Sequence, residues 1–255
     1  MSGKLWRNLA LGACLLASLP ARAAGVVSLN LCTDQLLVLL APQQVAALSP
    51  LSRDPALSFV AAQAAHLPVV RPSAEAVLRL HPDLVLATRY GAQTTLALLQ
   101  QEGVRVVRTG LPQSFPAIRA QIRRVAALLA VPARGEALIA AMDATLAGVR
   151  PRSGHPSAVA WEPRGYTAGL DSLLGAVLQA AGLRDIAHGR QIGVEALLRH
   201  PPDLLVVQQT PRFPSLATQM LHNPALAGIP RIAIPPALTV CAGPFTAQAV
   251  AMLAR

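Results

Sequence analysis

Residues 74–86 read AEAVLRLHPDLVL, and residues 194–206 read VEALLRHPPDLLV, which is the same pattern displaced by 120 positions. Each copy starts with a glutamate, Glu75 or Glu195, in the first turn of a short helix, where the helix dipole favours a negative charge. An arginine follows four residues later, near the helix end that favours a positive charge. A Pro-Asp turn and an apolar run complete each copy. The pattern predicts a helix, a turn and a buried strand, and its recurrence predicts two related halves.

Strand-like and helix-like segments alternate along the rest of the chain. The expected strands cover 26–29, 45–48, 84–87, 104–108, 158–161, 204–207 and 231–234. The expected helices cover 35–41, 73–80, 94–102, 114–130, 134–149, 170–181 and 194–199, with a last helix from residue 246. For the first helix we expect a polar turn at 30–34, with Thr33 or Asp34 as the N-cap. Strands alternating with helices favour parallel sheets covered on both faces.

The chain divides near its middle. A stretch rich in Pro, Gly and Ser at 151–156 follows a helix that contains no internal proline, and the strand pattern then restarts. We therefore expect an α/β fold of two Rossmann-like lobes with parallel sheets, bridged by a single long helix. The expected N-terminal lobe covers 24–132, the connecting helix 133–150 and the C-terminal lobe 151–255.

The first 23 residues have the organisation of a secretory signal peptide. Two basic residues precede an apolar run at 9–19, and Ala-Arg-Ala at 21–23 has the form of a cleavage site. The run is too short to span a bilayer. Lipid attachment at Cys14 is the less favoured alternative. We therefore expect an exported, periplasmic protein whose mature chain begins at Ala24.

Composition and motifs exclude several classes of function. The formal net charge is +10, but the arginines are scattered and only 3% of residues are aromatic, so a nucleic-acid partner is not expected. Hydrophobic residues make up 53% of the chain and charged residues 13%, which excludes a disordered chain. The sequence contains no phosphate-binding glycine loop and no G-x-S-x-G or H-E-x-x-H motif, so we do not expect an enzyme.

Several of these features occur together in one known family. They are VVSLNLCTDQLL at 26–37, the Glu75 segment ending in PDLV at 82–85, the Gly103-Val104 step, the connecting helix and the Glu195 segment. In their order and spacing the chain resembles the periplasmic substrate-binding proteins of ABC importers for iron-siderophore complexes, heme and cobalamin. The resemblance implies a monomer that holds its ligand between two lobes joined by a rigid helix. It also implies that Glu75 and Glu195 dock onto a permease dimer in the inner membrane.

The ligand site is expected at the carboxyl ends of the strands, where open α/β sheets bind ligands. The loops of the second lobe bring Trp161 and Tyr166 close together in sequence, and Tyr90 follows a strand of the first lobe. Trp161 packing inside its lobe is the alternative for that residue. The candidate ligand-binding residues are Asn30, Leu31, Cys32, Arg53, Arg89, Tyr90, Trp161, Arg164, Tyr166, Gln209, Arg212 and Cys241.

The expected ligand is a metal chelate, either an iron-siderophore complex or cobalamin, and no resident cofactor is expected. Heme is an alternative, because Tyr90 or Tyr166 can serve as an axial ligand. Zinc or manganese is a weaker alternative, because the six histidines show no metal-binding spacing. For Cys32 and Cys241, a disulfide across the lobes, thiolate contact with a ligand and unrelated burial all remain open.

Overall fold

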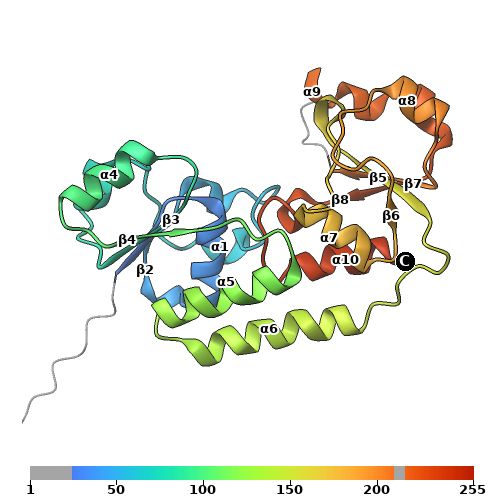
Figure 1. The fold of residues 1–255 in the computed structure, drawn as a ribbon. Helices are drawn as coiled ribbons and strands as arrows, with labels where there is room; N and C mark the ends of the chain where they lie inside the picture. Colours follow the sequence, from blue (N-terminus) through green and yellow to red (C-terminus); the bar gives the residue numbers. More distant parts are fainter. Residues whose placement is uncertain (1–24, 210–215) are drawn as a thin grey trace, which may run out of the picture.

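The computed structural model describes residues 25–209 and 216–255, which form two α/β lobes (Figure 1). The expected signal peptide, Arg212 and part of the loop after residue 208 lie outside the described residues. In the N-terminal lobe four parallel strands lie in the order β2-β1-β3-β4. Their bounds are β1 Val26–Ser28, β2 Val45–Ala47, β3 Leu84–Thr88 and β4 Val106–Thr109.

The C-terminal lobe repeats this arrangement in the order β6-β5-β7-β8, again with parallel pairing. The bounds are β5 Ser157–Trp161, β6 Arg184–Asp185, β7 Leu204–Gln208 and β8 Arg231–Ile234. The sequence pattern did not indicate β6, which is only two residues long. The expected fold class, two lobes with parallel sheets, is confirmed.

Helices cover the two sheets and connect them. They are α1 Leu31–Leu40, α2 Ala61–Ala64, α3 Ala74–Leu78, α4 Gln93–Gln101, α5 Phe115–Leu128, α6 Pro132–Ala147, α7 Leu173–Ala180, α8 Val194–Arg199, α9 Leu216–Gln219 and α10 Thr246–Leu253. None of the helices in the described ranges is long and apolar enough to cross a membrane.

The start of α1 corrects one expectation. The segment expected as a polar turn is already helical, and the N-cap is Asn30 rather than Thr33 or Asp34. The Asn30 side-chain oxygen accepts hydrogen bonds from the backbone N–H groups of Cys32 and Thr33, both at 3.1 Å. Asparagine is among the strongest N-cap residues, so it begins the helix at the earliest position that offers one.

The repeated segments occupy equivalent places in the two lobes. The first copy forms α3 and β3, the second forms α8 and β7, and each strand is the third in its sheet. Asp83 accepts a hydrogen bond from the backbone N–H of Gly25 at 2.7 Å, and Asp203 accepts one from the backbone N–H of Ser157 at 2.7 Å. The aspartate of each Pro-Asp turn thus fixes the start of the first strand of its own lobe.

The apolar core has two local parts and one shared part. One local cluster lies between the N-terminal sheet, α3 and α4, and the other lies against the C-terminal sheet and α8. The shared cluster runs through both lobes and includes Leu37, Val125, Leu178 and Val250. Since this cluster is continuous, neither lobe can move far without exposing buried apolar surface.

The long helix α6 runs beneath both lobes (Figure 1). Arg119 of α5 pairs with Asp143 at 2.6 Å, and Arg123 pairs with Glu136 at 2.8 Å, which holds α6 against α5. A Cβ atom at Gly135 would lie 2.6 Å from the Ala126 Cβ, so glycine is required for this close approach of the two helices. The helix also packs against α10 of the C-terminal lobe.

Candidate functional site

Loops at the carboxyl ends of strands from both lobes meet along one cleft. A cavity of about 320 Å³ lies between the segment 54–57, which follows β2, and Gln209, Pro235 and Pro236, which follow β7 and β8. A second cavity of about 570 Å³ lies between Gln113 of the first lobe and residues that include Ser172 and His188 of the second. These two cavities are the inter-lobe space expected for a ligand.

Three contacts fasten the lobes to each other at the cleft. Cys32, in the first turn of α1, forms a disulfide with Cys241, in the loop after β8, with the two Cα atoms 5.2 Å apart. Phe59 stacks on Phe245 with ring centroids 4.7 Å apart. The Gln113 side-chain oxygen accepts a hydrogen bond from the backbone N–H of Leu173 at 2.8 Å. The lobes are therefore joined covalently, by an aromatic stack and by a hydrogen bond.

The disulfide answers the question that the sequence left open for the two cysteines. The bonded sulfur atoms are not thiolates, so neither can act as a thiolate ligand for a metal. Disulfides persist in oxidising compartments, which agrees with an exported protein. The two cysteines therefore join the N-terminal lobe to the C-terminal lobe.

The other residues at the start of α1 make contacts within the N-terminal lobe or its core. Asn30 caps the helix, and Leu31 is buried in the shared core. The hydroxyl groups of Ser28 and Thr33 lie 2.7 Å apart. Asn30 therefore serves as a helix cap and Leu31 as a core residue, whether or not either one contacts a ligand.

Two of the expected arginines and both tyrosines lie on exposed cleft loops. Tyr90 follows β3 and is 68% exposed, and Tyr166 follows β5 and is 53% exposed. Arg89 and Arg164 are exposed next to them. Gln209 is exposed and lines the smaller cavity. These side chains are accessible on loops at the carboxyl ends of their strands, but of the residues in this group only Gln209 lines one of the two cavities between the lobes.

Arg53 makes contacts within its own lobe. Its guanidinium donates to the backbone oxygens of Leu67 at 2.6 Å and Ala64 at 3.4 Å. These bonds hold the loop after β2 against α2, and they leave the group less free to meet a ligand than Arg89 or Arg164.

Trp161 corrects another expectation, because it is 0% exposed and lies in the core of the C-terminal lobe. Its indole N–H donates to the backbone oxygen of Ile192 at 3.0 Å. Trp161 is the last residue of β5, and its side chain packs in the same cluster as Leu197 and Leu205. The alternative interpretation, packing inside the lobe, is the one that the structure supports.

For two acidic side chains, Asp34 and Glu162, the structure adds a burial that the sequence did not show. Asp34 is fully buried and accepts hydrogen bonds from both the backbone N–H and the hydroxyl of Ser49, at 3.1 and 2.5 Å. Burial raises the pKa of Asp34 from the ordinary 3.8 to about 7, although the bonds from Ser28 and Ser49 oppose that shift. Burial also raises the pKa of Glu162, the first residue after β5. Only the fold shows their burial, since their neighbours come from distant segments.

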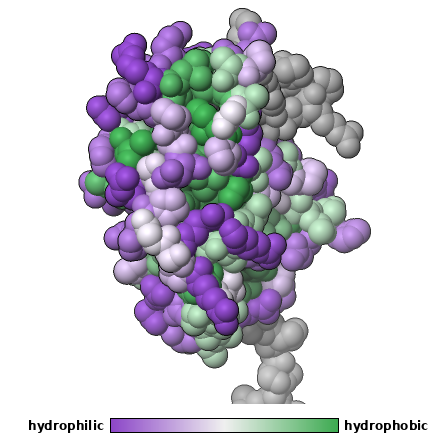
Figure 2. Space-filling model, turned by 90° about the vertical axis from the view of Figure 1, so that its right-hand side faces the viewer, coloured by the Kyte–Doolittle hydropathy of each residue, from purple (hydrophilic) through white to green (hydrophobic). Residues whose placement is uncertain are grey.

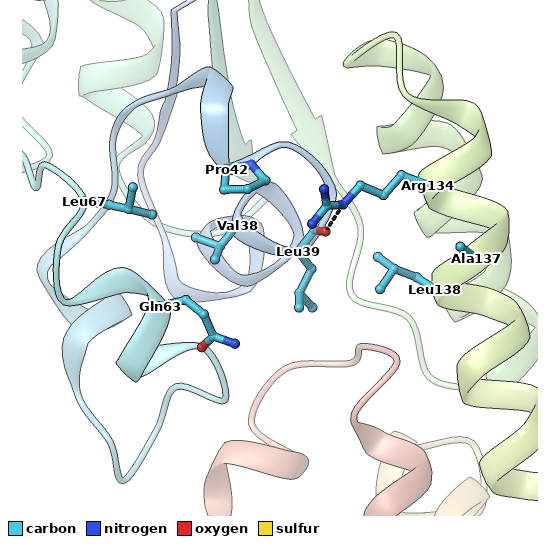
Figure 3. A pocket seen from close by; sticks show the side chains of 8 residues that line it. All are labelled: Val38, Leu39, Pro42, Gln63, Leu67, Arg134, Ala137 and Leu138. Carbon is cyan, nitrogen blue, oxygen red and sulfur yellow. Dashed lines mark hydrogen bonds between the residues drawn. The ribbon is translucent and has the colours of Figure 1, made fainter.

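A separate pocket of about 390 Å³ lies between α1, α2 and α6, away from the strand ends (Figure 3). Its walls are mainly apolar, and Val38, Leu67 and Leu138 are among them. Arg134 of α6 donates from Nε to the backbone oxygen of Leu39 at 2.9 Å, near the end of α1. This bond ties the long helix to α1, and none of the expected ligand-binding residues lines the pocket.

The chain is similar to several known proteins. Residues 26–233 match the family model described as periplasmic binding protein. Cobalamin-binding proteins from two strains of Halobacterium salinarum are 29% identical over 146 residues, which are 52% of this chain and 39% of the length of those relatives.

Solved structures of two periplasmic heme-binding proteins are similar to this chain in fold. The periplasmic heme-binding protein RhuT from Roseiflexus sp. RS-1, in its apo form, has a TM-score of 0.71 and 25% identity, over 91% of this chain and 97% of that one. The periplasmic heme-binding protein HutB of Vibrio cholerae has a TM-score of 0.74 and 18% identity, over 90% of this chain and 96% of that one. The match to HutB concerns the fold alone.

The buried carboxyl of Asp34 predicts a specific pH dependence of stability. Between about pH 4 and pH 7 the folded protein keeps a proton on Asp34 that the unfolded chain has released, so the stability that this group contributes falls as the pH rises. We expect the free energy of unfolding of wild type to fall relative to that of Asp34→Asn by about 1–3 kcal/mol between pH 5 and pH 8. Urea denaturation at several pH values measures this difference. A difference that stays constant with pH contradicts the prediction.

Proposed function

Because the chain belongs to the periplasmic binding protein family, we propose that it captures a metal chelate in the cleft between its lobes and delivers it to an ABC importer permease. The proposed chelate is a corrinoid of the cobalamin type or an iron-siderophore complex. The members of this family are binding proteins, so the chain binds its substrate without transforming it.

The observation that carries this proposal is the smaller cavity between the lobes, whose walls are mainly apolar and include Leu57, Pro235 and Pro236. Large hydrophobic side chains are also exposed in segments that follow strands in both lobes, although others are exposed elsewhere, on or near helices. Those that follow strands are Leu51, Tyr90, Leu111, Tyr166, Leu170 and Val240. Figure 2 shows that hydrophobic residues also gather on the outer side of the C-terminal lobe, mainly in the upper half of the face that is turned away from the N-terminal lobe. Apolar surface on facing loops suits a large, flat chelate.

The corrinoid is the favoured chelate. The curated relatives that match half of this chain bind cobalamin. A bare zinc or manganese ion is disfavoured, because the residues that the structure describes contain no group of three or more His, Cys, Asp or Glu that can hold a metal. A corrinoid brings its metal already ligated, so the protein needs apolar surface and hydrogen bonds instead.

Heme is the second candidate, and a specific observation supports it. The phenol groups of Tyr90 and Tyr166 are both exposed in the cleft loops, and a tyrosine oxygen can ligate heme iron. The heme-binding protein RhuT also shares 25% of its aligned residues with this chain.

The proposal also covers the export of the protein and its docking onto the permease. A signal peptide at 1–23 directs export to the periplasm, and the mature monomer has lobes at 24–132 and 151–255 joined by the segment 133–150. Glu75, in the first turn of α3, is 82% exposed and pairs with Arg79 at 2.6 Å, while Glu195 is exposed in the first turn of α8. Their equivalent places in the two lobes support their assignment as paired docking points for the two halves of a permease dimer.

The ligand assignment is tested by titrating the purified mature chain with cyanocobalamin, dicyanocobinamide, hemin, ferric siderophores, Zn²⁺ and Mn²⁺. We expect a corrinoid to raise the melting temperature, since a ligand at 100 times its dissociation constant adds about 2.7 kcal/mol of stability. A shift with hemin alone, accompanied by a tyrosinate-type absorption spectrum that is lost in Tyr90→Phe or Tyr166→Phe, supports the second candidate. A shift with Zn²⁺ or Mn²⁺ alone contradicts both.

The docking assignment is tested by the double variant Glu75→Ala, Glu195→Ala. We expect it to lose most ligand-dependent stimulation of permease ATPase activity, because the charges that meet the permease are removed, while its ligand affinity stays at the wild-type value. Glu102→Ala, at the exposed C-terminal end of α4, is the matched control. If the double variant binds its ligand more weakly than wild type does, the assignment of the two glutamates to permease docking is wrong.

A further inference from the structure

Glu162 is an acidic side chain at the strand ends of the C-terminal lobe, and its carboxyl group has no side-chain partner among the described residues. It is the first residue after β5 and is only partly exposed. Its backbone N–H donates to the backbone oxygen of Tyr166 at 2.8 Å, which closes the loop. Within the described ranges, its carboxyl group takes part in none of the ion pairs or side-chain hydrogen bonds. Burial raises its pKa, with no neighbouring cation acting in the opposite direction.

Glu162 lies beside two further polar residues. A crevice between β5, β7 and β8, too narrow to hold a water molecule, brings Glu162 together with Gln208 and Thr239, and its other walls are apolar, including Leu174 and Ile234. The Thr239 hydroxyl oxygen is buried and has no hydrogen-bond partner in the described part of the chain. Unpartnered buried polar groups are costly and uncommon in folded proteins. Glu162 and Gln208 lie at the carboxyl ends of β5 and β7, the end of an open α/β sheet where a ligand is expected.

We propose that Glu162 is a specificity-determining residue, which selects chelates whose edge carries hydrogen-bond donors such as primary amides over chelates whose edge carries carboxylates. This inference rests on the proposed function, and it assigns a recognition role to one residue of that same cleft. The partly exposed side chain of Gln208 is the neighbouring group that completes the polar contact.

The chemistry of the carboxyl group supports this selection. A glutamate oxygen accepts a hydrogen bond from an amide N–H, and charge strengthens that bond. A carboxylate at the same place on the ligand would repel it, and like charges placed together disfavour the wrong partner. Corrinoids such as cobinamide carry amides around the ring, whereas heme carries propionates.

The cations of the cleft do not reverse this preference. Arg89 and Arg164 are exposed on loops, where water and salt screen their charges. Glu162 is partly buried, so its charge acts in a medium of lower effective dielectric constant and is felt more strongly at short range.

The test compares two corrinoids that share one ring and one metal. Dicyanocobinamide presents primary amides, and dicyanocobyrinic acid presents carboxylates at the same positions. Dissociation constants for both are measured by calorimetry with wild type, Glu162→Gln and Glu102→Gln. The last variant makes the same change of charge at the end of α4, next to the amino end of β4 and away from the strand ends that form the cleft. Thermal melting of each variant verifies that it is folded.

We expect wild type and Glu102→Gln to prefer the amide form by about tenfold or more, and Glu162→Gln to reduce that preference to about threefold or less. An unchanged preference in Glu162→Gln, or no preference in wild type, overturns the inference and leaves the proposed function standing. Failure of wild type to bind either corrinoid overturns the corrinoid assignment, and the inference with it.

Discussion

One covalent bond, between Cys32 and Cys241, constrains the whole arrangement of the two lobes. It joins residues 209 positions apart, and it does so between the two lobes rather than within one lobe. In the chain-entropy description a loop of this length contributes about 5 kcal/mol of stability by restricting the unfolded chain. The native consequence is geometric, since the start of α1 and the loop after β8 cannot separate. Any movement of the lobes must turn about this point.

The remaining contacts between the lobes also resist their separation. The shared core, the stack of Phe59 on Phe245 and the bond from Leu173 to Gln113 would all be lost if the cleft opened widely. A regular helix cannot absorb a large change of dihedral angle at one residue, so α6 also limits hinge rotation of one lobe relative to the other. A cleft of this kind is largely formed before its ligand arrives, and binding then loses little free energy to ordering the protein.

Sequence patterns are sufficient for the fold but not for the partners of single side chains. The repeat at 74–86 and 194–206 predicted two related lobes because helix signals and apolar runs are local. The start of α1 was misplaced because Asn30 is a stronger N-cap than the residues that follow it. The burial of Trp161 and the isolation of Glu162 depend on segments brought together only in the folded chain. The disulfide was one of three alternatives, since spacing alone cannot fix which cysteines meet.

The disulfide and the shared core hold the two lobes in one arrangement, so we expect the protein to change shape little when a ligand binds. Small-angle X-ray scattering of the oxidised mature chain, with and without saturating ligand, measures this change. We expect the radius of gyration and the pair-distance distribution to coincide within error in the two states. A clear contraction on binding, of the kind produced when separate lobes close around a hinge, would contradict this expectation.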